Sequence, residues 1–165
     1  HFALKTDSLF AATINKTLHR NFMGYTSNKT QLMIGLGMSA ISDSWYGFAQ
    51  NVKTVKEYKK IVNTGKIPVF RGHILSEEDQ VIRKHILNIM CHFYTSWDSK
   101  STKIENLDFH LNLLKELEKD NLVLIDENSL SVPEKARPFV RNICMAFDKK
   151  LQLNSKNNDV FSMTI

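Results

Sequence analysis

The sequence predicts a mixed α+β fold in which helices predominate. Apolar residues recur at helical spacing in several segments, a glycine-rich apolar run near the front is typical of a strand, and a short hairpin pattern lies around residue 126. The 165 residues, of which 42% are hydrophobic and 24% charged, have the size and composition of one globular domain, or of one domain and a piece of another.

The front of the chain is organised around residues 19–51, which follow a helix expected from Thr6 or Asp7 to about Leu18. Residues 32–37 are apolar, and we expect them to form a strand buried on both faces. The four glycines within residues 19–51 indicate that the backbone comes close to another group. A ligand-binding loop and a tightly packed strand without a ligand both explain these residues, so both interpretations stay open.

The second part of the chain begins near residues 51–54, where the character of the sequence changes. Pro68 indicates that residues 67–73 form an extended linker, because proline cannot donate a backbone hydrogen bond. Ser76 and the three acids after it mark the start of an amphipathic helix of about 18 residues. Further helices are expected at 54–63, 104–119 and 138–151, a β-hairpin at 122–132, and a loose tail after that.

Composition limits the function classes. No apolar run reaches the ~20 residues that cross a bilayer, and the beginning lacks a signal-peptide pattern, so we expect a cytoplasmic protein with no membrane partner. The net charge is +5, but the Lys and Arg residues are scattered, and no nucleic-acid partner is predicted. Because the chain opens on His1 rather than Met, we expect it to be a fragment of a longer protein.

No self-contained catalytic centre is visible in the sequence. Phosphate-loop and dinucleotide fingerprints are missing, and Ser39 and Ser42 have no nucleophile-elbow pattern around them. His85 and His92 lie two helical turns apart, and Cys91 and Cys144 are isolated, so we expect packed side chains rather than ligands. We therefore predict no catalytic residue and no metal ligand in this chain.

A winged-helix nucleic-acid-binding module is one alternative from another class. The order helix, hairpin, helix in the second half and the basic pI of about 9.2 favour it. Against it, the presumed recognition segment carries Glu116, Glu118 and Asp120, whose charges would repel phosphate.

Several motifs in register resemble the C-terminal third of the bacterial oxygen-independent coproporphyrinogen III oxidase family. They include His-Arg-Asn-Phe-Met-Gly-Tyr-Thr, Gly-Leu-Gly-Met-Ser-Ala-Ile-Ser and Arg-Asn-Ile-Cys-Met-Ala-Phe-Asp, and together the similarity runs from His1 to about Leu151. The matching segments are residues 1–4, 19–26, 35–42, 46–51, 71–72 and 141–148.

The resemblance implies an oxidoreductase of haem and porphyrin biosynthesis. Such radical S-adenosylmethionine (SAM) enzymes decarboxylate two propionates of coproporphyrinogen III to give protoporphyrinogen IX, using SAM, a [4Fe-4S] cluster and an electron donor. Residues 1–53 would be the last elements of the parallel β/α barrel. Residues 54–165 would form a helical C-terminal domain, with a small winged-helix-like hairpin, that covers the active site. The full-length protein would be a monomer.

The resemblance also implies which residues bind cofactor. Phe22, Met23 and Ile41 correspond to positions that contact a second SAM molecule, although Met23 replaces a glutamine often found there. The cluster-binding cysteines lie outside this sequence, so the fragment alone should be inactive. Arg20, Arg71 and Arg141 are candidates for pairing with propionates. A related haem chaperone that does not oxidise coproporphyrinogen is the alternative within the same superfamily.

Overall fold

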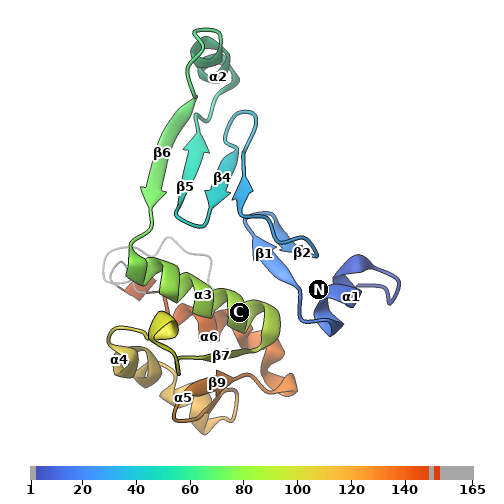
Figure 1. Ribbon diagram of the computed structural model, residues 1–165, viewed down its shortest axis with the longest axis vertical. Coiled ribbons are helices and arrows are strands. Elements are labelled where there is room, and N and C mark those ends of the chain that lie inside the picture. Colours follow the sequence, from blue (N-terminus) through green and yellow to red (C-terminus); the bar gives the residue numbers. More distant parts are fainter. Residues whose placement is uncertain (1–2, 149–150, 153–165) are drawn as a thin grey trace. The chain divides into compact units, whose positions relative to one another are not determined.

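The computed structural model describes residues 3–148 and 151–152, and the chain divides into two compact units, His1–Gln80 and Val81–Ile165. The secondary structure of the two units is mixed α+β, with small antiparallel sheets (Figure 1). No helix within the described ranges is both long and apolar enough to cross a membrane.

The first unit contains a β-hairpin and a four-stranded antiparallel sheet in the order β3-β4-β5-β6. Asp7 caps the first helix by accepting a hydrogen bond from the Leu9 N–H at 2.7 Å, as its predicted start requires. Figure 1 shows α2 beyond one end of this sheet, between β5 and β6 in the chain. The elements are α1 Ser8–Ile14, β1 His19–Asn21, β2 Gly24–Thr26, β3 Leu32–Met33, β4 Ile41–Ser44, β5 Gly47–Asn51, α2 Val55–Val62 and β6 Val69–Ile74.

The prediction of a doubly buried strand over residues 32–37 is wrong. Only Leu32–Met33 pair as a strand, while Ile34 and Leu36 are 66% and 84% exposed. The chain leaves the ladder after Met33, and Gly37 in the loop that follows has a φ of +100°, which favours glycine. The apolar side chains that suggested a buried strand therefore line an exposed loop in the described chain.

The prediction of an extended linker over residues 67–73 is also wrong, since most of this segment is strand β6. Its register pairs Gln50 with Arg71 and Phe48 with His73. Pro68 does not interrupt the sheet because it lies just before β6, where it needs no N–H, and its carbonyl still accepts from the Val52 N–H at 2.9 Å. Residues on both sides of position 53 thus share one sheet, and the assignment of domains to 1–53 and 54–165 stays a prediction.

The helix predicted after Ser76 is confirmed as α3, Glu77–His92, whose first residues belong to the first unit and the rest to the second. Its capping is reciprocal: the Asp79 N–H donates to the Ser76 hydroxyl, and the Ser76 N–H donates to the Asp79 carboxylate, both at 3.1 Å. The predicted hairpin is present too, and β7 joins it to give a sheet in the order β7-β9-β8. The remaining elements are β7 Tyr94–Ser96, η1 Lys100–Thr102, α4 Leu107–Asn112, α5 Lys115–Lys119, β8 Leu124–Ile125, β9 Ser129–Ser131, η2 Glu134–Phe139 and α6 Val140–Met145.

Two helix predictions in this unit need correction. The segment 104–119 forms two short helices, because the α-helix is interrupted at Leu113 and Leu114. The inward-facing apolar residues nevertheless continue at helical spacing across this break. The helix expected over 138–151 is α-helical over Val140–Met145, and Pro138 lies in the preceding 3₁₀ helix. The tail after residue 152 lies outside the described residues.

Three stacked rings form the centre of the second unit. The ring of Phe147 lies between those of His85 and His110, at centroid distances of 6.4 and 5.6 Å and with planes 19° and 10° apart. All three side chains are almost completely buried. Cys91 and Cys144 are buried free thiols, which confirms that they are packed side chains.

Candidate functional site

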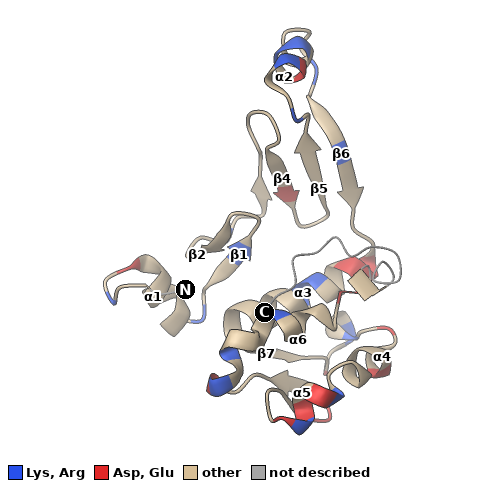
Figure 2. Ribbon diagram, turned by 180° about the vertical axis from the view of Figure 1, so that it is seen from behind, with Lys and Arg blue, Asp and Glu red and all other residues tan. Residues whose placement is uncertain are grey.

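One face of the four-stranded sheet collects the side chains of interest. Directly paired residues of antiparallel strands point to the same face, so the register defines two rows across the sheet. Figure 2 marks the cation of β6, which is Arg71, and the acid of β4, which is Asp43. The first row contains Met33, Asp43, Phe48 and His73, and the second contains Ile41, Gln50 and Arg71.

The turn of the β1–β2 hairpin lies against this same face. The ring of Phe22 meets that of Phe48 at a centroid distance of 5.0 Å. The Asn21 side chain approaches the Met33 sulfur at 4.0 Å. Since Ile41 and Phe48 are diagonal neighbours in the register, ordinary sheet geometry separates their Cα atoms by about 7–8 Å. Phe22 and Ile41 therefore share one surface of this unit.

The three predicted cofactor residues differ in how far their side chains are exposed. The Phe22 side chain is 53% exposed and Ile41 is half-buried, so each can offer apolar surface to a ligand. Met23 is 87% exposed, and only its backbone N–H is fixed, by donation to the Asn21 side-chain oxygen at 2.8 Å. The first two positions suit a shared contact surface better than Met23 does.

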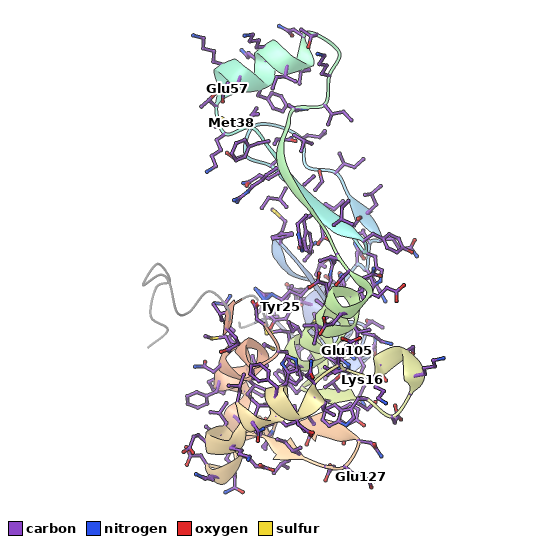
Figure 3. The ribbon with its side chains drawn as sticks, turned by 90° about the vertical axis from the view of Figure 1, so that its left-hand side faces the viewer. Lys16, Tyr25, Met38, Glu57, Glu105 and Glu127 are labelled. Carbon is purple, nitrogen blue, oxygen red and sulfur yellow. The ribbon has the colours of Figure 1, made fainter. Side chains whose placement is uncertain are left out.

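The loop between β3 and β4 is held in place by side chains from outside it. Asn51 is buried, and its amide donates to the carbonyls of Gly35 and Gly37 at 3.0 and 2.9 Å. The Gly37 N–H donates to the Tyr58 hydroxyl at 3.1 Å, and Figure 3 shows Met38 of this loop close to α2. These contacts fix the backbone that leads into Ile41.

The glycines of this region serve close packing of backbone. A Cβ on Gly35 would lie 2.7 Å from the Ile41 carbonyl oxygen, and one on Gly47 would lie 2.6 Å from that of His73. The sequence pattern indicated a close approach correctly, but at these two positions the approaching group is a neighbouring strand or loop.

The Arg71 side chain, on the edge strand β6, forms a hydrogen bond with the neighbouring strand. Its Nε donates to the Gln50 side-chain oxygen at 2.9 Å, and the Gln50 amide nitrogen donates to the Ser39 carbonyl at 3.2 Å. Among the described residues, no carboxylate lies within ion-pair distance of Arg71. The guanidinium thus keeps its outer nitrogens available for an anionic group.

The other two candidate arginines do not join this face. The Arg20 guanidinium lies over the Tyr25 ring at 5.4 Å, and its buried Nε has no hydrogen-bond partner. In the hairpin register Arg20 and Tyr25 form a pair, on the side opposite to Asn21. Arg141 is an exposed residue of α6 in the second unit.

In the second unit, the titratable side chain of His85 is buried and held by hydrogen bonds. Burial lowers the pKa of His85 below its ordinary value; the hydrogen bond to the Thr102 carbonyl opposes this shift, and Lys84 and His110 add to it. That carbonyl can only accept, so Nε2 of His85 carries the proton and Nδ1 accepts from the Thr95 hydroxyl at 2.7 Å. Within the described part of the chain, no three His, Cys, Asp or Glu residues gather as a metal site would need.

Sequence reasoning missed Phe48 and Gln50, which complete the face next to Phe22 and Ile41. Their signal is their position: residues 48 and 50 lie as far after the two-residue turn Trp45–Tyr46 as residues 43 and 41 lie before it, which makes them cross-strand partners. This turn lacks the Asn-Gly or Asp-Gly pair that is typical of a two-residue hairpin, so the sequence does not indicate the pairing.

Comparison with known proteins finds relatives of this chain by sequence and by structure. No protein-family model matches the chain. The oxygen-independent coproporphyrinogen III oxidases of Pseudomonas aeruginosa and Escherichia coli are 34% and 36% identical, over 100% and 94% of this chain. The solved structure of the Escherichia coli coproporphyrinogen III oxidase, a radical SAM enzyme, superposes with a TM-score of 0.82 over 91% of this chain at 36% identity.

The match covers only part of these relatives. This chain spans 36% of the Pseudomonas protein, 35% of the Escherichia protein and 36% of the solved structure. Sequence identity and backbone agreement over nearly the whole chain show common ancestry. The chain is therefore homologous to oxygen-independent coproporphyrinogen III oxidase over about a third of that protein's length.

Proposed function

We propose that this chain is the part of an oxygen-independent coproporphyrinogen III oxidase that supplies one side of a SAM site and the cover over the substrate. The observation that carries the proposal is the agreement with the Escherichia coli enzyme, with a TM-score of 0.82 at 36% identity. In the proposed reaction, two propionates of coproporphyrinogen III each lose CO₂, one proton and two electrons and become vinyl groups, and one molecule of SAM per propionate would accept the two electrons as it is cleaved. The product is protoporphyrinogen IX, an intermediate of haem biosynthesis.

Within that enzyme, residues 1–53 would complete a parallel β/α barrel and residues 54–165 would form the helical cover. The sequence resemblance supports this division, although β6 at 69–74 pairs with β5 and so extends the front part. Enclosure by the cover would exclude water from the reacting carbon atoms.

The sheet face that carries Ile41, Phe48, Gln50 and Arg71, with Phe22 packed against it, is the candidate face. The chemistry of its side chains fits SAM. Phe22 offers a half-exposed aromatic ring to the adenine or the sulfonium, and Ile41 offers an apolar contact on the same face. Met23 would add at most apolar surface, since a thioether scarcely forms hydrogen bonds. Phe48 would orient Phe22 from below.

The [4Fe-4S] cluster does not fit the residues of this chain. Both cysteines, Cys91 and Cys144, are buried among the apolar residues of the second unit, and two thiols cannot supply the ligands of such a cluster. Cluster ligands would come from sequence outside these 165 residues. When bound, the cluster and SAM supply the radical chemistry, for which an electron donor is needed.

The direct test uses the full-length protein that carries this chain, with its cluster reconstituted under anaerobic conditions. Given SAM, a reductant and coproporphyrinogen III, it should form protoporphyrinogen IX with two CO₂ per substrate. Haem binding without any protoporphyrinogen would instead select the haem chaperone of the same superfamily. We further expect a cytoplasmic monomer, which sedimentation of the full-length protein can check.

A second candidate, a winged-helix nucleic-acid-binding module, is favoured by the topology of the second unit. The order α3, β7, α4, α5, β8, β9 with the sheet β7-β9-β8 is that of a winged helix. The helix before the wing, α5, carries Glu116, whose side chain is 84% exposed, and Glu118. Acids at this position oppose phosphate contacts. A gel shift of nucleic acid that depends on salt concentration would support this function.

A further inference from the structure

We propose that Arg71, oriented by Gln50, binds a ligand carboxylate at the candidate face, an inference that rests on the proposed function. Two ligands of the proposed enzyme carry this chemistry: the propionates of coproporphyrinogen III and the methionyl carboxylate of SAM. The group recognised is the same in both, and binding measurements distinguish the two sources.

The orientation of Gln50 follows from its partners. The Ser39 carbonyl can only accept a hydrogen bond, so the amide nitrogen of Gln50 must point to it, at 3.2 Å. The amide oxygen then faces β6 and accepts from Arg71 Nε at 2.9 Å. Because Gln50 and Arg71 are directly paired across β5 and β6, the backbone register holds both ends of this interaction.

The bond through Nε leaves the two terminal nitrogens of the guanidinium free to form a bidentate contact. A planar guanidinium binds a carboxylate through two parallel hydrogen bonds. Arg137 offers a contrast, since it approaches Glu134 at 3.8 Å and lies over the Phe93 ring at 4.7 Å. Among the described residues, Arg71 has no carboxylate within ion-pair distance and no aromatic ring beneath it.

The charges of the sheet favour an anion at Arg71. Within strands β3–β6, Arg71 is the only Lys or Arg and Asp43 the only Asp or Glu. Asp43 is buried in the other row and has interactions of its own. Arg71 lies in the row of Ile41, one strand beyond Gln50, so a ligand resting on Phe22 and Ile41 could extend its carboxylate toward the guanidinium.

The test measures ligand binding to the full-length protein with Arg71→Met, Arg71→Lys and Gln50→Met, and with Arg137→Met as the matched control. One arm titrates SAM and, for comparison, decarboxylated SAM. The other arm titrates coproporphyrin III, the oxidised form of the substrate, through its fluorescence. We expect Arg71→Met to weaken binding about tenfold in one arm only, with Arg71→Lys and Gln50→Met intermediate and Arg137→Met unchanged.

The arms identify the carboxylate. If it belongs to SAM, native protein should bind SAM more tightly than decarboxylated SAM, and Arg71→Met should remove that preference. If it belongs to the substrate, the KM for coproporphyrinogen III should rise in Arg71→Met while kcat changes little. Unchanged affinity for both probes in correctly folded Arg71→Met protein would overturn the proposal. Failure of the proposed function would appear differently, as lack of protoporphyrinogen formation by the unmodified protein.

Discussion

The ring of Phe22 stands edge-on against the ring of Phe48, with centroids 5.0 Å apart and planes inclined by 88°. Phe22 comes from the hairpin turn and Phe48 from the start of β5, so one contact joins two segments about 26 residues apart. Such a pair contributes about 0.5–1.5 kcal/mol beyond the area it buries. The contact also fixes which side of Phe22 remains open to a ligand.

Replacing Phe48 with Leu should therefore weaken SAM binding, although Phe48 lies beneath Phe22. Loss of the ring contact frees Phe22 to sample other rotamers, and we expect affinity to fall by about three- to tenfold. Equilibrium dialysis with the full-length protein measures this change. Phe70→Leu is the matched control, since the Phe70 ring is exposed, lies 5.8 Å from Lys53 Nζ and should leave affinity unaltered when replaced.

Asn51 should prove essential for the loop before Ile41. Asn51→Ala removes the donor that satisfies the part-buried carbonyls of Gly35 and Gly37, and the loss of such a hydrogen bond costs about 0.5–1.5 kcal/mol each. Hydrogen exchange across residues 34–41 should accelerate in this variant. Asn28→Ala, in the exposed segment between β2 and β3, serves as the control; equal exchange in both variants would show that Asn51 does not hold the loop.

Gly35→Ala should disturb the candidate face without touching any charged group. The added methyl would meet the Ile41 carbonyl oxygen at 2.7 Å, a distance that real Cβ atoms essentially never show, so the loop or β4 must shift. We expect weaker SAM binding together with a displaced Ile41 in a crystal structure of the variant. An unshifted β4 with native affinity would contradict this account of Gly35.

The stability of the second unit should decrease in mild acid because of His85. Its pKa is lowered in the folded state, mainly by burial, so below about pH 6.5 the unfolded chain takes up a proton that the folded chain resists. The free energy of unfolding should then fall as the pH drops through 6.5 toward the folded-state pKa, and change no further below it.

Hydrogen exchange of α3 at pH 7 and pH 5, with rates corrected for intrinsic pH dependence, measures this effect in the full-length protein. His85→Gln, which keeps a neutral hydrogen-bonding side chain, should lose much of the pH dependence. His92→Gln is the control on the same helix, because His92 is exposed. A pH dependence that survives His85→Gln undiminished would assign the effect to other groups.

The sequence predicted elements whose signals are local. The start of α3 follows from Ser76 and the acids after it, and the end of α2 from Gly65, whose φ is +72°. Pairings between distant segments were not predictable in the same way. The sequence predicts a linker in place of strand β6 because Pro68 is atypical of a strand, and the partner strand β5 lies 18 or more residues earlier in the chain.

The candidate site shows the same limit. Phe22 and Ile41 are predicted as cofactor residues through a family resemblance, and the structure adds that Phe22 packs against the sheet face that carries Ile41. Residue types alone could not identify Gln50 as the partner of Arg71, because that pairing depends on the register of two strands joined through a helix. The apolar run at 32–37 predicts a buried strand wrongly, because its hydrophobic side chains are largely exposed in the described chain.

The number of SAM molecules bound by the full-length protein tests the central claim most directly. The account predicts two per protein by equilibrium dialysis with labelled SAM, and one when Phe22 and Ile41 are replaced together by Ala and Ser. Two molecules still bound with unchanged affinity in that folded double variant would show that this sheet face is not a SAM site.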